Sequence, residues 1–365
     1  MKRSHDKTRV DESLLLGYLL LMITGLIMIY SASSILAESR FGSHTHFLTK
    51  QLFWVGLSLA VVYVLGKLDL KRLAPFSAPA ILGTFLLLSL VFLMPARNGS
   101  HRWLFLGPLT IQPSELFKWL MVYYLAFSLS NPQRDLTDLK QILFPYMPIL
   151  GIGIGLIIVE PDLGAVIVIV ATMLGIFFLA GARLFHLFTA TIPAVALGSF
   201  FVFVLGYKKD RILNYLATIG DPLQGGYHVK QAALTLGSGG LFGAGFGDGR
   251  QKLFFLPYPH TDFIFATMGE ELGFIGLLVV LGLFAFIMYR GIRIAAAQPD
   301  RFGFLLAAGM TWSLFVNIAI NIGVVTAMFP VTGRALPFLS YGGSSLLISS
   351  ACVGVLLNLS RRVRT

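Results

Sequence analysis

The chain has 365 residues, of which 56% are hydrophobic and only 12% charged, and its net charge is +11. A soluble domain carries about 25% charged residues and much shorter apolar runs, so the composition excludes a water-soluble globular protein. Most of the positive charge falls in short connections between apolar runs, where membrane topology accounts for it, and this excludes a nucleic-acid partner. The lone Cys352 excludes an intramolecular disulfide.

Apolar runs of membrane-spanning length recur from one end of the chain to the other. The hydrocarbon layer of a bilayer is about 30 Å thick and needs about 20 apolar residues per helix. The sequence therefore predicts an all-α, polytopic membrane protein with about ten transmembrane helices in one transmembrane domain, residues 1–365. The predicted spans are 14–35, 48–66, 75–94, 114–130, 142–159, 163–181, 184–206, 263–289, 303–328 and 339–359.

The distribution of Lys and Arg predicts the orientation. Basic residues in short loops stay on the cytoplasmic side of a membrane, and here most of them fall on the side that carries both termini. We therefore expect cytoplasmic N- and C-termini. The basic N-terminal stretch resembles a signal peptide, but the apolar run after it, at about 20 residues, is too long for a cleaved signal core and favours a signal anchor.

Glu115 and Lys118 are ionisable side chains near the start of the fourth predicted span. A charge in hydrocarbon costs at least about 2.5–3.5 kcal/mol, so each such residue is a functional candidate. The two lie three residues apart on one helix face and are predicted to form an ion pair. The alternative to a functional role is a purely structural ion pair near the outer interface. Further on, residues 160–164 predict a tight outer turn in which Asp162 caps the next helix.

The connection between spans seven and eight, residues 207–262, is predicted to be a large extracytoplasmic loop. It is far longer than most connections between helices, and loops of this length are commonly functional. It begins with basic residues that include Lys208, Lys209 and Arg211, and it becomes glycine-rich from Gly237 onward. We expect function to lie in this loop.

Span eight carries three carboxylates. Asp262 lies at its outer mouth, where it can stay ionised and reach a substrate from outside; the alternative is a helix N-cap that satisfies the first turn. Glu270 lies about 12 Å deeper at the helical rise per residue. Glu270 and its neighbour Glu271 must therefore face protein or water rather than lipid.

The basic residues on the outer side are predicted to line a positively charged cavity. Such a cavity suits an anionic lipid head group, above all a pyrophosphate, because Arg forks and Lys point charges match phosphate oxygens. Taken singly, each is more typical of an interfacial side chain that keeps its charge at the membrane surface. The residues are Arg102, Lys118, Lys208, Lys209, Arg211 and Arg334.

Together these segments resemble the SEDS family of bacterial cell-wall polymerases, the shape, elongation, division and sporulation proteins, over nearly the whole chain. The most specific strings are HTDFIF at 260–265 and LPFLSYGGSS at 336–345; the others are at 30–34, 102–103, 112–118, 161–164, 221–222, 226–228, 237–240 and 269–273. Residues 251–253, 269–273 and 344–347 resemble the division branch, FtsW, more than the elongation branch, RodA. The chain departs from the family at Tyr258, where Glu is usual.

The resemblance implies a peptidoglycan glycosyltransferase that polymerises lipid II, the undecaprenyl-pyrophosphate-linked precursor, at the outer face of the bacterial cytoplasmic membrane, for the septal wall. Asp262 matches the catalytic residue, and as general base it would drive a direct displacement with inversion. No cofactor is certain; a divalent cation, Mg²⁺ or Mn²⁺, remains an alternative to Arg and Lys for stabilising the leaving pyrophosphate. The predicted substrate-binding residues are Arg102, Glu115, Lys118, Lys208, Arg211, His260, Arg334 and Ser340.

The resemblance also implies partners: a class B penicillin-binding transpeptidase with a single span, and other divisome proteins. Two alternatives remain open on the sequence. In a lipid II flippase the buried charges would line a translocation path, and in a non-catalytic scaffold for the transpeptidase no acidic residue would matter. A transporter should depend most on its mid-membrane charges, whereas a polymerase should depend most on Asp262.

Overall fold

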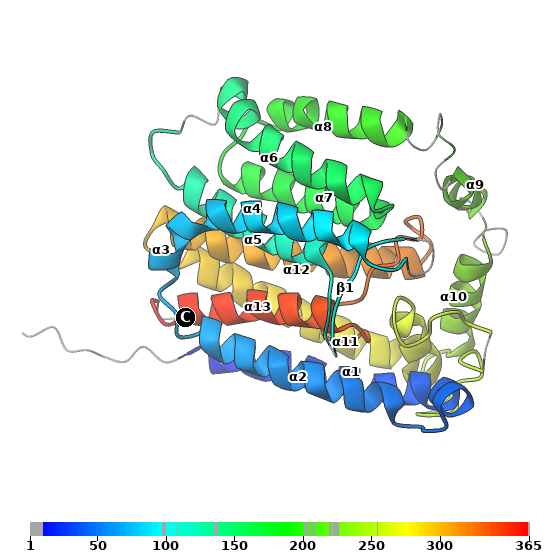
Figure 1. Cartoon of the computed structure of the whole chain (residues 1–365). Coiled ribbons are helices and arrows are strands. Elements are labelled where there is room, and N and C mark those ends of the chain that lie inside the picture. Colours follow the sequence, from blue (N-terminus) through cyan, green and yellow to red (C-terminus); the bar gives the residue numbers. More distant parts are fainter. Residues whose placement is uncertain are drawn as a thin grey trace, which may run out of the picture.

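The computed structural model describes residues 10–96, 100–107, 109–134, 138–200, 203, 206, 209–218, 221, 226–253 and 255–363. Helices dominate the chain (Figure 1). They are α1 (Glu12–Phe41), α2 (His46–Leu65), α3 (Leu70–Leu73), α4 (Ser77–Leu90), α5 (Pro113–Leu129), α6 (Leu139–Val159), α7 (Leu163–Leu179), α8 (Leu184–Ser199), α9 (Lys209–Thr218), α10 (Tyr227–Ser238), α11 (Ile264–Ala296), α12 (Arg301–Val325) and α13 (Gly343–Ser360).

Six helical stretches of the described residues are long and apolar enough to cross a membrane. They are Glu12–Phe41, His46–Leu65, Leu70–Leu93, Ile264–Ala296, Arg301–Val325 and Gly343–Ser360. These confirm a multi-pass membrane protein and coincide with predicted spans one, two, three, eight, nine and ten. The other four predicted spans coincide with helices α5, α6, α7 and α8, so the count of ten crossings stays a prediction.

One element departs from the all-α prediction. Strands β1 (Leu104–Leu106) and β2 (Leu109–Ile111) form a short antiparallel hairpin directly before α5. The hairpin is tied to the start of α13, because the Ser344 hydroxyl donates to the Thr110 carbonyl at 2.7 Å and accepts from the Gln112 amide at 3.0 Å. This connection places the beginning of α5 beside the beginning of α13.

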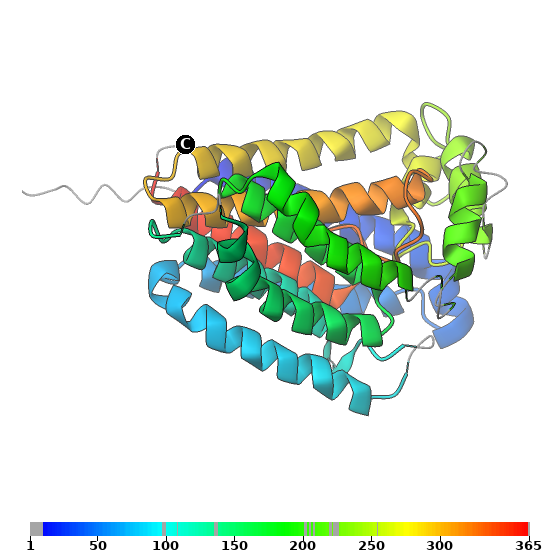
Figure 2. The same cartoon turned by 90° about the horizontal axis from the view of Figure 1, so that it is seen from above.

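The long helices run side by side in both views, with α12 in the interior (Figures 1 and 2). Helix α12 packs against α5, α7, α11 and α13, and α13 packs against α2. Because protein rather than lipid surrounds them, these two helices carry buried polar side chains, including Asn317, Asn321 and Asn358. The polar groups needed for a site can therefore be held inside the bundle.

The two ends of the described chain lie at the same end of the bundle. The Asp11 amide donates to the Ser360 hydroxyl at 3.1 Å, and the Asp11 carboxylate accepts from Arg290 at 2.6 and 2.9 Å. Helices α9 and α10, which belong to the predicted extracytoplasmic loop, lie at the opposite end (Figure 1). This agrees with the predicted arrangement of termini and loop, while the cytoplasmic side remains a prediction.

Candidate active site

The predicted catalytic residue, Asp262, lies at the end of the bundle that carries α9 and α10, directly before α11. It is partly exposed. The N-cap of α11 is Phe263, one residue later, and its side chain makes no capping hydrogen bond. The alternative in which Asp262 caps the first turn stays a prediction. Gly333 lies beside the carboxylate: a Cβ built on Gly333 would be 3.6 Å from Asp262 Oδ2.

The chain that leads to Asp262 is fixed by four consecutive backbone carbonyls, each of which accepts a hydrogen bond. Every donor comes from a residue after Asp262 in the chain, on α11, α12 or the segment before α13, so the position of Asp262 depends on tertiary packing. The bonds are Thr267 Oγ1 to Pro259 O (3.2 Å), Tyr341 N to His260 O (2.9 Å), Ser340 Oγ to Thr261 O (2.6 Å) and Asn321 Nδ2 to Asp262 O (2.9 Å).

The predicted ion pair between Glu115 and Lys118 is confirmed. Lys118 Nζ lies 2.7 Å from Glu115 Oε2, and both side chains are only 3% exposed. Both residues of the pair also contact other side chains: Lys118 donates to Asn317 at 3.3 Å, and the Arg334 guanidinium contacts the second oxygen of Glu115. Asn321 ties this group to Asp262, since its amide nitrogen also donates to the Arg334 carbonyl at 2.6 Å.

Asp162 has both predicted and additional roles. Its carboxylate caps α7 by accepting from the Ala165 amide at 3.1 Å, as the turn pattern predicted. It also accepts from the side-chain amide of Gln112 at 2.9 Å and forms ion pairs with Arg102 at 3.5 Å and Arg334 at 3.7 Å. The capping carboxylate is therefore also part of the charged cluster.

We call Arg102, Glu115, Lys118, Asp162 and Arg334 the outer cluster. Three residues of the predicted positive cavity, Arg102, Lys118 and Arg334, pair with two carboxylates in this mixed-charge cluster, and the cavity itself stays a prediction. The predicted Lys208 lies outside the described residues, and Arg211 belongs to α9 with its side chain outside them. The outer cluster keeps a net positive charge and can attract an anion.

Two electrostatic features bear on the cluster. Burial, and then the neighbouring Arg102, lower the pKa of Arg334 to about 10, which leaves the guanidinium charged at neutral pH. The Nε of Arg102 is buried without a hydrogen-bond partner among the described residues. Buried polar atoms are normally satisfied, so an unpaired donor beside the cluster suggests a group that arrives with a ligand.

His260 and Ser340, predicted to bind substrate, are buried. The His260 ring packs between Phe47 and Tyr341, and burial, followed by the charge of Arg40, lowers its pKa to about 4, so the ring is neutral at physiological pH. The Ser340 hydroxyl donates to the Thr261 carbonyl, as described above, and accepts from the Leu336 backbone amide at 2.8 Å. Both residues support the segment that carries Asp262, and direct substrate contact stays a prediction.

The residues present do not form a metal site of the usual protein-built kind. Among the described residues, no group of three or more His, Cys, Asp or Glu side chains is arranged to hold a metal ion. The mechanism below therefore uses the Arg and Lys side chains of the outer cluster and takes no step through a cation.

Sequence reasoning missed the amides of the site. Asn317 and Asn321 lie four residues apart on α12 and so share one face of an otherwise apolar helix. Polar residues on one face of a membrane helix are themselves a signal, because lipid tolerates them poorly. Their partners, Lys118 and the backbone of Asp262, are distant in sequence and could not be predicted from this pattern.

Comparisons with known proteins identify the family of the chain. Residues 11–365 match the family described as the FtsW, RodA and SpoVE cell cycle proteins. The chain is 42% identical to stage V sporulation protein E of Bacillus subtilis strain 168, covering 98% of this chain and 99% of the relative. It is 39% identical to a probable peptidoglycan glycosyltransferase FtsW of Geobacter sp. strain M18, covering 97% of each chain.

Two solved structures share the fold. One, described as the structural coordination of polymerization and crosslinking by a peptidoglycan synthase complex, is 28% identical with a TM-score of 0.79, covering 97% of this chain and 98% of the other. The crystal structure of the Thermus thermophilus rod shape determining protein RodA is 28% identical with a TM-score of 0.72, covering 98% of each chain. The chain therefore belongs to the FtsW, RodA and SpoVE family, the SEDS proteins that its motifs predicted.

Proposed function

We propose that this protein is an inverting peptidoglycan glycosyltransferase that polymerises lipid II at the outer face of the bacterial cytoplasmic membrane. The observation that carries the proposal is a partly exposed carboxylate, Asp262, held by four tethered carbonyls beside the buried cations of the outer cluster. A relative that is 39% identical is named a probable peptidoglycan glycosyltransferase, which supports the same reaction class.

The chemistry requires a base and a stabiliser of negative charge. The acceptor sugar hydroxyl must lose a proton as it attacks the anomeric carbon, and the Asp262 carboxylate can accept that proton. The departing lipid pyrophosphate develops negative charge that Arg102, Lys118 and Arg334 can stabilise. Direct displacement needs no covalent enzyme intermediate, so we expect inversion at the anomeric carbon.

The membrane architecture suits such a substrate. Lipid II and the undecaprenyl pyrophosphate product keep their polyprenyl chains in the bilayer, so the sugar phosphates must reach the site sideways from the outer leaflet. A site built at the ends of membrane helices, with its base near the surface, meets this requirement. We therefore propose a multi-pass location in the bacterial inner membrane.

The distribution of buried charge favours an enzyme over a flippase. Among the described residues, the buried Asp, Glu, Lys, Arg and His side chains other than Asp11 belong to the end of the bundle that carries Asp262; they are Glu115, Lys118, Glu160, Asp162, Lys252, His260, Glu270, Glu271 and Arg334. A translocation path for a pyrophosphate would need polar groups along its whole length. A non-catalytic scaffold would not require the hydrogen bonds that fix the backbone at Asp262.

We further propose a role in septal wall synthesis with a class B penicillin-binding transpeptidase and other divisome proteins. The FtsW name of a 39% identical relative supports the division branch over RodA, whose solved structure is 28% identical. The relative that is 42% identical is named a stage V sporulation protein, so a role in wall synthesis during sporulation is the second candidate. The solved complex that coordinates polymerization and crosslinking supports the transpeptidase partner.

The deciding experiment uses purified protein in detergent, where flipping has no meaning. Wild-type protein, with and without the co-purified transpeptidase, is incubated with lipid II, and glycan strands are resolved on gels. Asp262→Asn should lower the polymerisation rate by about 10²–10⁴-fold, because the variant loses its general base. Thermal unfolding and elution as a single species confirm that the variant is folded.

Asp248→Asn is the matched control, because Asp248 is an exposed carboxylate in the segment that precedes Asp262. It should polymerise lipid II within about twofold of wild type, as expected for a surface change. Undiminished polymerisation by folded Asp262→Asn would reject the enzymatic assignment of this carboxylate. Absence of product from wild-type protein with its transpeptidase would favour the flippase or the scaffold.

A further inference from the structure

Helix α11 is interrupted at Gly273, whose backbone has φ 69° and ψ −173°. A break inside a membrane helix leaves carbonyl and amide groups that lipid cannot satisfy. The chain from Gly239 to Lys252, which we call the glycine segment, satisfies them. Its bonds to α11 are Ala244 N to Glu270 O (2.8 Å), Gly245 N to Glu271 O (3.2 Å), Phe274 N to Gly240 O (2.9 Å) and Ile275 N to Leu241 O (3.1 Å).

The side chains of both glutamates continue this attachment. The Glu270 carboxylate accepts from the backbone amides of Arg250 at 2.7 Å and Gln251 at 3.1 Å. The Glu271 carboxylate accepts from the Gly247 amide at 3.2 Å. The two glutamates, 3% and 1% exposed, therefore face protein as predicted, and they hold the glycine segment along α11.

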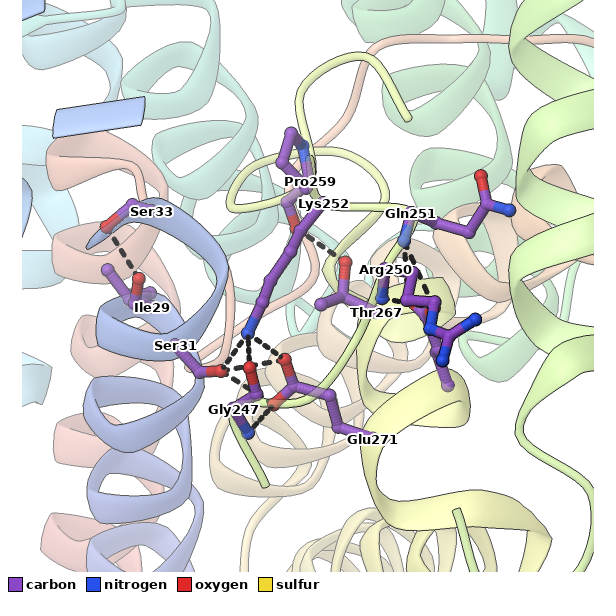
Figure 3. A network of polar contacts seen from close by, with 11 residues as sticks. Ile29, Ser31, Ser33, Gly247, Arg250, Gln251, Lys252, Pro259, Thr267 and Glu271 are labelled. Carbon is purple, nitrogen blue, oxygen red and sulfur yellow. Dashed lines mark hydrogen bonds and ion pairs between the residues drawn. The ribbon is translucent and has the colours of Figure 1, made fainter. Parts of the chain in front are cut away.

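Lys252, at the end of the glycine segment, closes the arrangement (Figure 3). Its ammonium group lies 2.7 Å from Glu271 Oε1, and it also donates to the Gly247 carbonyl at 2.6 Å and to Ser31 Oγ at 3.1 Å. Ser31 on α1 lies 2.6 and 2.7 Å from the two oxygens of Glu271. All three protons of the ammonium group have an acceptor, and the Lys252 and Glu271 side chains are only 4% and 0% exposed.

This group has no capacity left for a substrate. A buried, fully paired network stabilises one conformation of the backbone around it, whereas a network that binds a ligand keeps unsatisfied atoms. Lys252 lies at the start of the turn that leads on to Asp262. In this turn the Leu253 amide donates to the Arg250 carbonyl at 3.0 Å and the Leu256 amide donates to the Gln251 carbonyl at 2.8 Å. Leu256 is buried, and Asp262 follows six residues later.

We infer that Ser31, Lys252 and Glu271 form a positioning lock that joins α1, the glycine segment and α11 and thereby sets the position of Asp262. The inference rests on the proposed function for its catalytic consequence. Lys252 is a positioning residue: it touches the glycine segment and the helix, while the outer cluster binds the substrate. Loss of the lock should lower kcat more than it changes KM, because a small displacement of the base slows the chemical step.

The test compares four variants in purified protein: Lys252→Met, Lys252→Arg, the double variant Lys252→Met with Glu271→Gln, and Ser31→Ala. Lys252→Met should lower kcat for lipid II polymerisation by about 10–100-fold with KM within about twofold. Lys252→Arg, which keeps the cation, should recover part of kcat. Ser31→Ala loses one partner of the lock and should show a smaller loss of about threefold.

The double variant separates positioning from stability. Lys252→Met alone leaves the Glu271 charge buried and unpaired, which threatens folding, whereas removing both charges restores thermal stability. A lock predicts that kcat stays low in the stable double variant. Recovery of kcat together with stability would overturn the inference.

A second readout does not depend on the proposed function. Hydrogen exchange followed by mass spectrometry should show exchange of the amides in residues 244–251 at least about tenfold faster in the double variant and in Ser31→Ala. Lys230→Met is the matched control, because Lys230 is exposed on neighbouring α10, and its exchange and kcat should equal those of wild type. Wild-type exchange in the lock variants would overturn the inference even if no polymerisation were detected in any protein.

Discussion

Two buried charged groups lie at the same end of this molecule and differ in how completely they are paired. In the lock, one cation meets one carboxylate, and every proton of Lys252 has an acceptor. In the outer cluster, Arg102, Lys118 and Arg334 form ion pairs with two carboxylates, Glu115 and Asp162, and Arg102 Nε has no hydrogen-bond partner among the described residues.

The difference separates a structural role from a binding role. A balanced, fully hydrogen-bonded pair offers nothing to a ligand and fixes the backbone that carries it. The outer cluster has one more cation than carboxylates and includes a buried donor without a partner among the described residues, and unsatisfied groups of this kind gather at functional sites. Burial alone would not have distinguished the two groups, since every member of both except Arg102, whose side chain is 18% exposed, is buried.

After Asp262→Asn, large effects should come from the outer cluster. Glu115→Ala and Lys118→Ala should each lower lipid II polymerisation by about 10–100-fold, because each leaves a buried charge unpaired and disturbs Arg334. The double variant should be no worse than either single variant, since residues that act as one pair are not additive. The measurement is the polymerisation rate of folded protein. Arg293→Ala, an exposed cation on α11, is the control. Additive losses would show that the two residues act separately.

A smaller effect, on stability, tests how tightly the glycine segment approaches α11. A Cβ added to Gly239 would lie 1.9 Å from the Gly269 carbonyl oxygen, which belongs to backbone that cannot yield easily. Gly239→Ala should therefore destabilise the protein by about 1–3 kcal/mol, measured as a lower midpoint of thermal unfolding.

Gly237→Ala is the matched control for Gly239→Ala, because a Cβ at Gly237 would meet nothing within 4 Å and alanine favours the helix α10. Its midpoint should equal or slightly exceed that of wild type. Equal midpoints for the two variants would contradict the close contact between the glycine segment and α11.

The smallest expected effect concerns Glu160, beside the outer cluster. Burial, and then the Asp162 charge, raise its pKa from 4.5 to about 8, with Arg102 opposing. Both of its oxygens lack a hydrogen-bond partner among the described residues. The folded protein thus holds this proton more tightly than the unfolded chain does. The contribution of this proton to the free energy of unfolding is fully present below about pH 4.5 and is lost as pH rises through about 8.

Glu160→Gln has no proton to lose, so this loss of stability should be absent. The midpoint of thermal unfolding of the variant should approach that of wild type near pH 5 and exceed it by about 2 °C or more at pH 9. Measurements at intervals between these values follow the titration. Parallel curves for the two proteins would show that Glu160 does not titrate in this window.

Local patterns in the sequence were enough to predict several parts of this protein. Apolar runs predicted helices at every proposed span, because helix formation in lipid depends on residues that are near in sequence. The Glu115–Lys118 pair and the Asp162 cap were also predictable, since their partners lie within one helical turn. The motifs predicted the family and Asp262 as its candidate base.

Only the tertiary structure decided which distant residues meet. Arg334 contacts Glu115 across more than 200 residues of chain, and Ser31 meets Glu271 and Lys252 from another helix. The break at Gly273 and the glycine segment that satisfies it could not be predicted as a unit, because each is unfavourable without the other. A helical period fixes which residues share a face, whereas the packing of the bundle decides which faces meet.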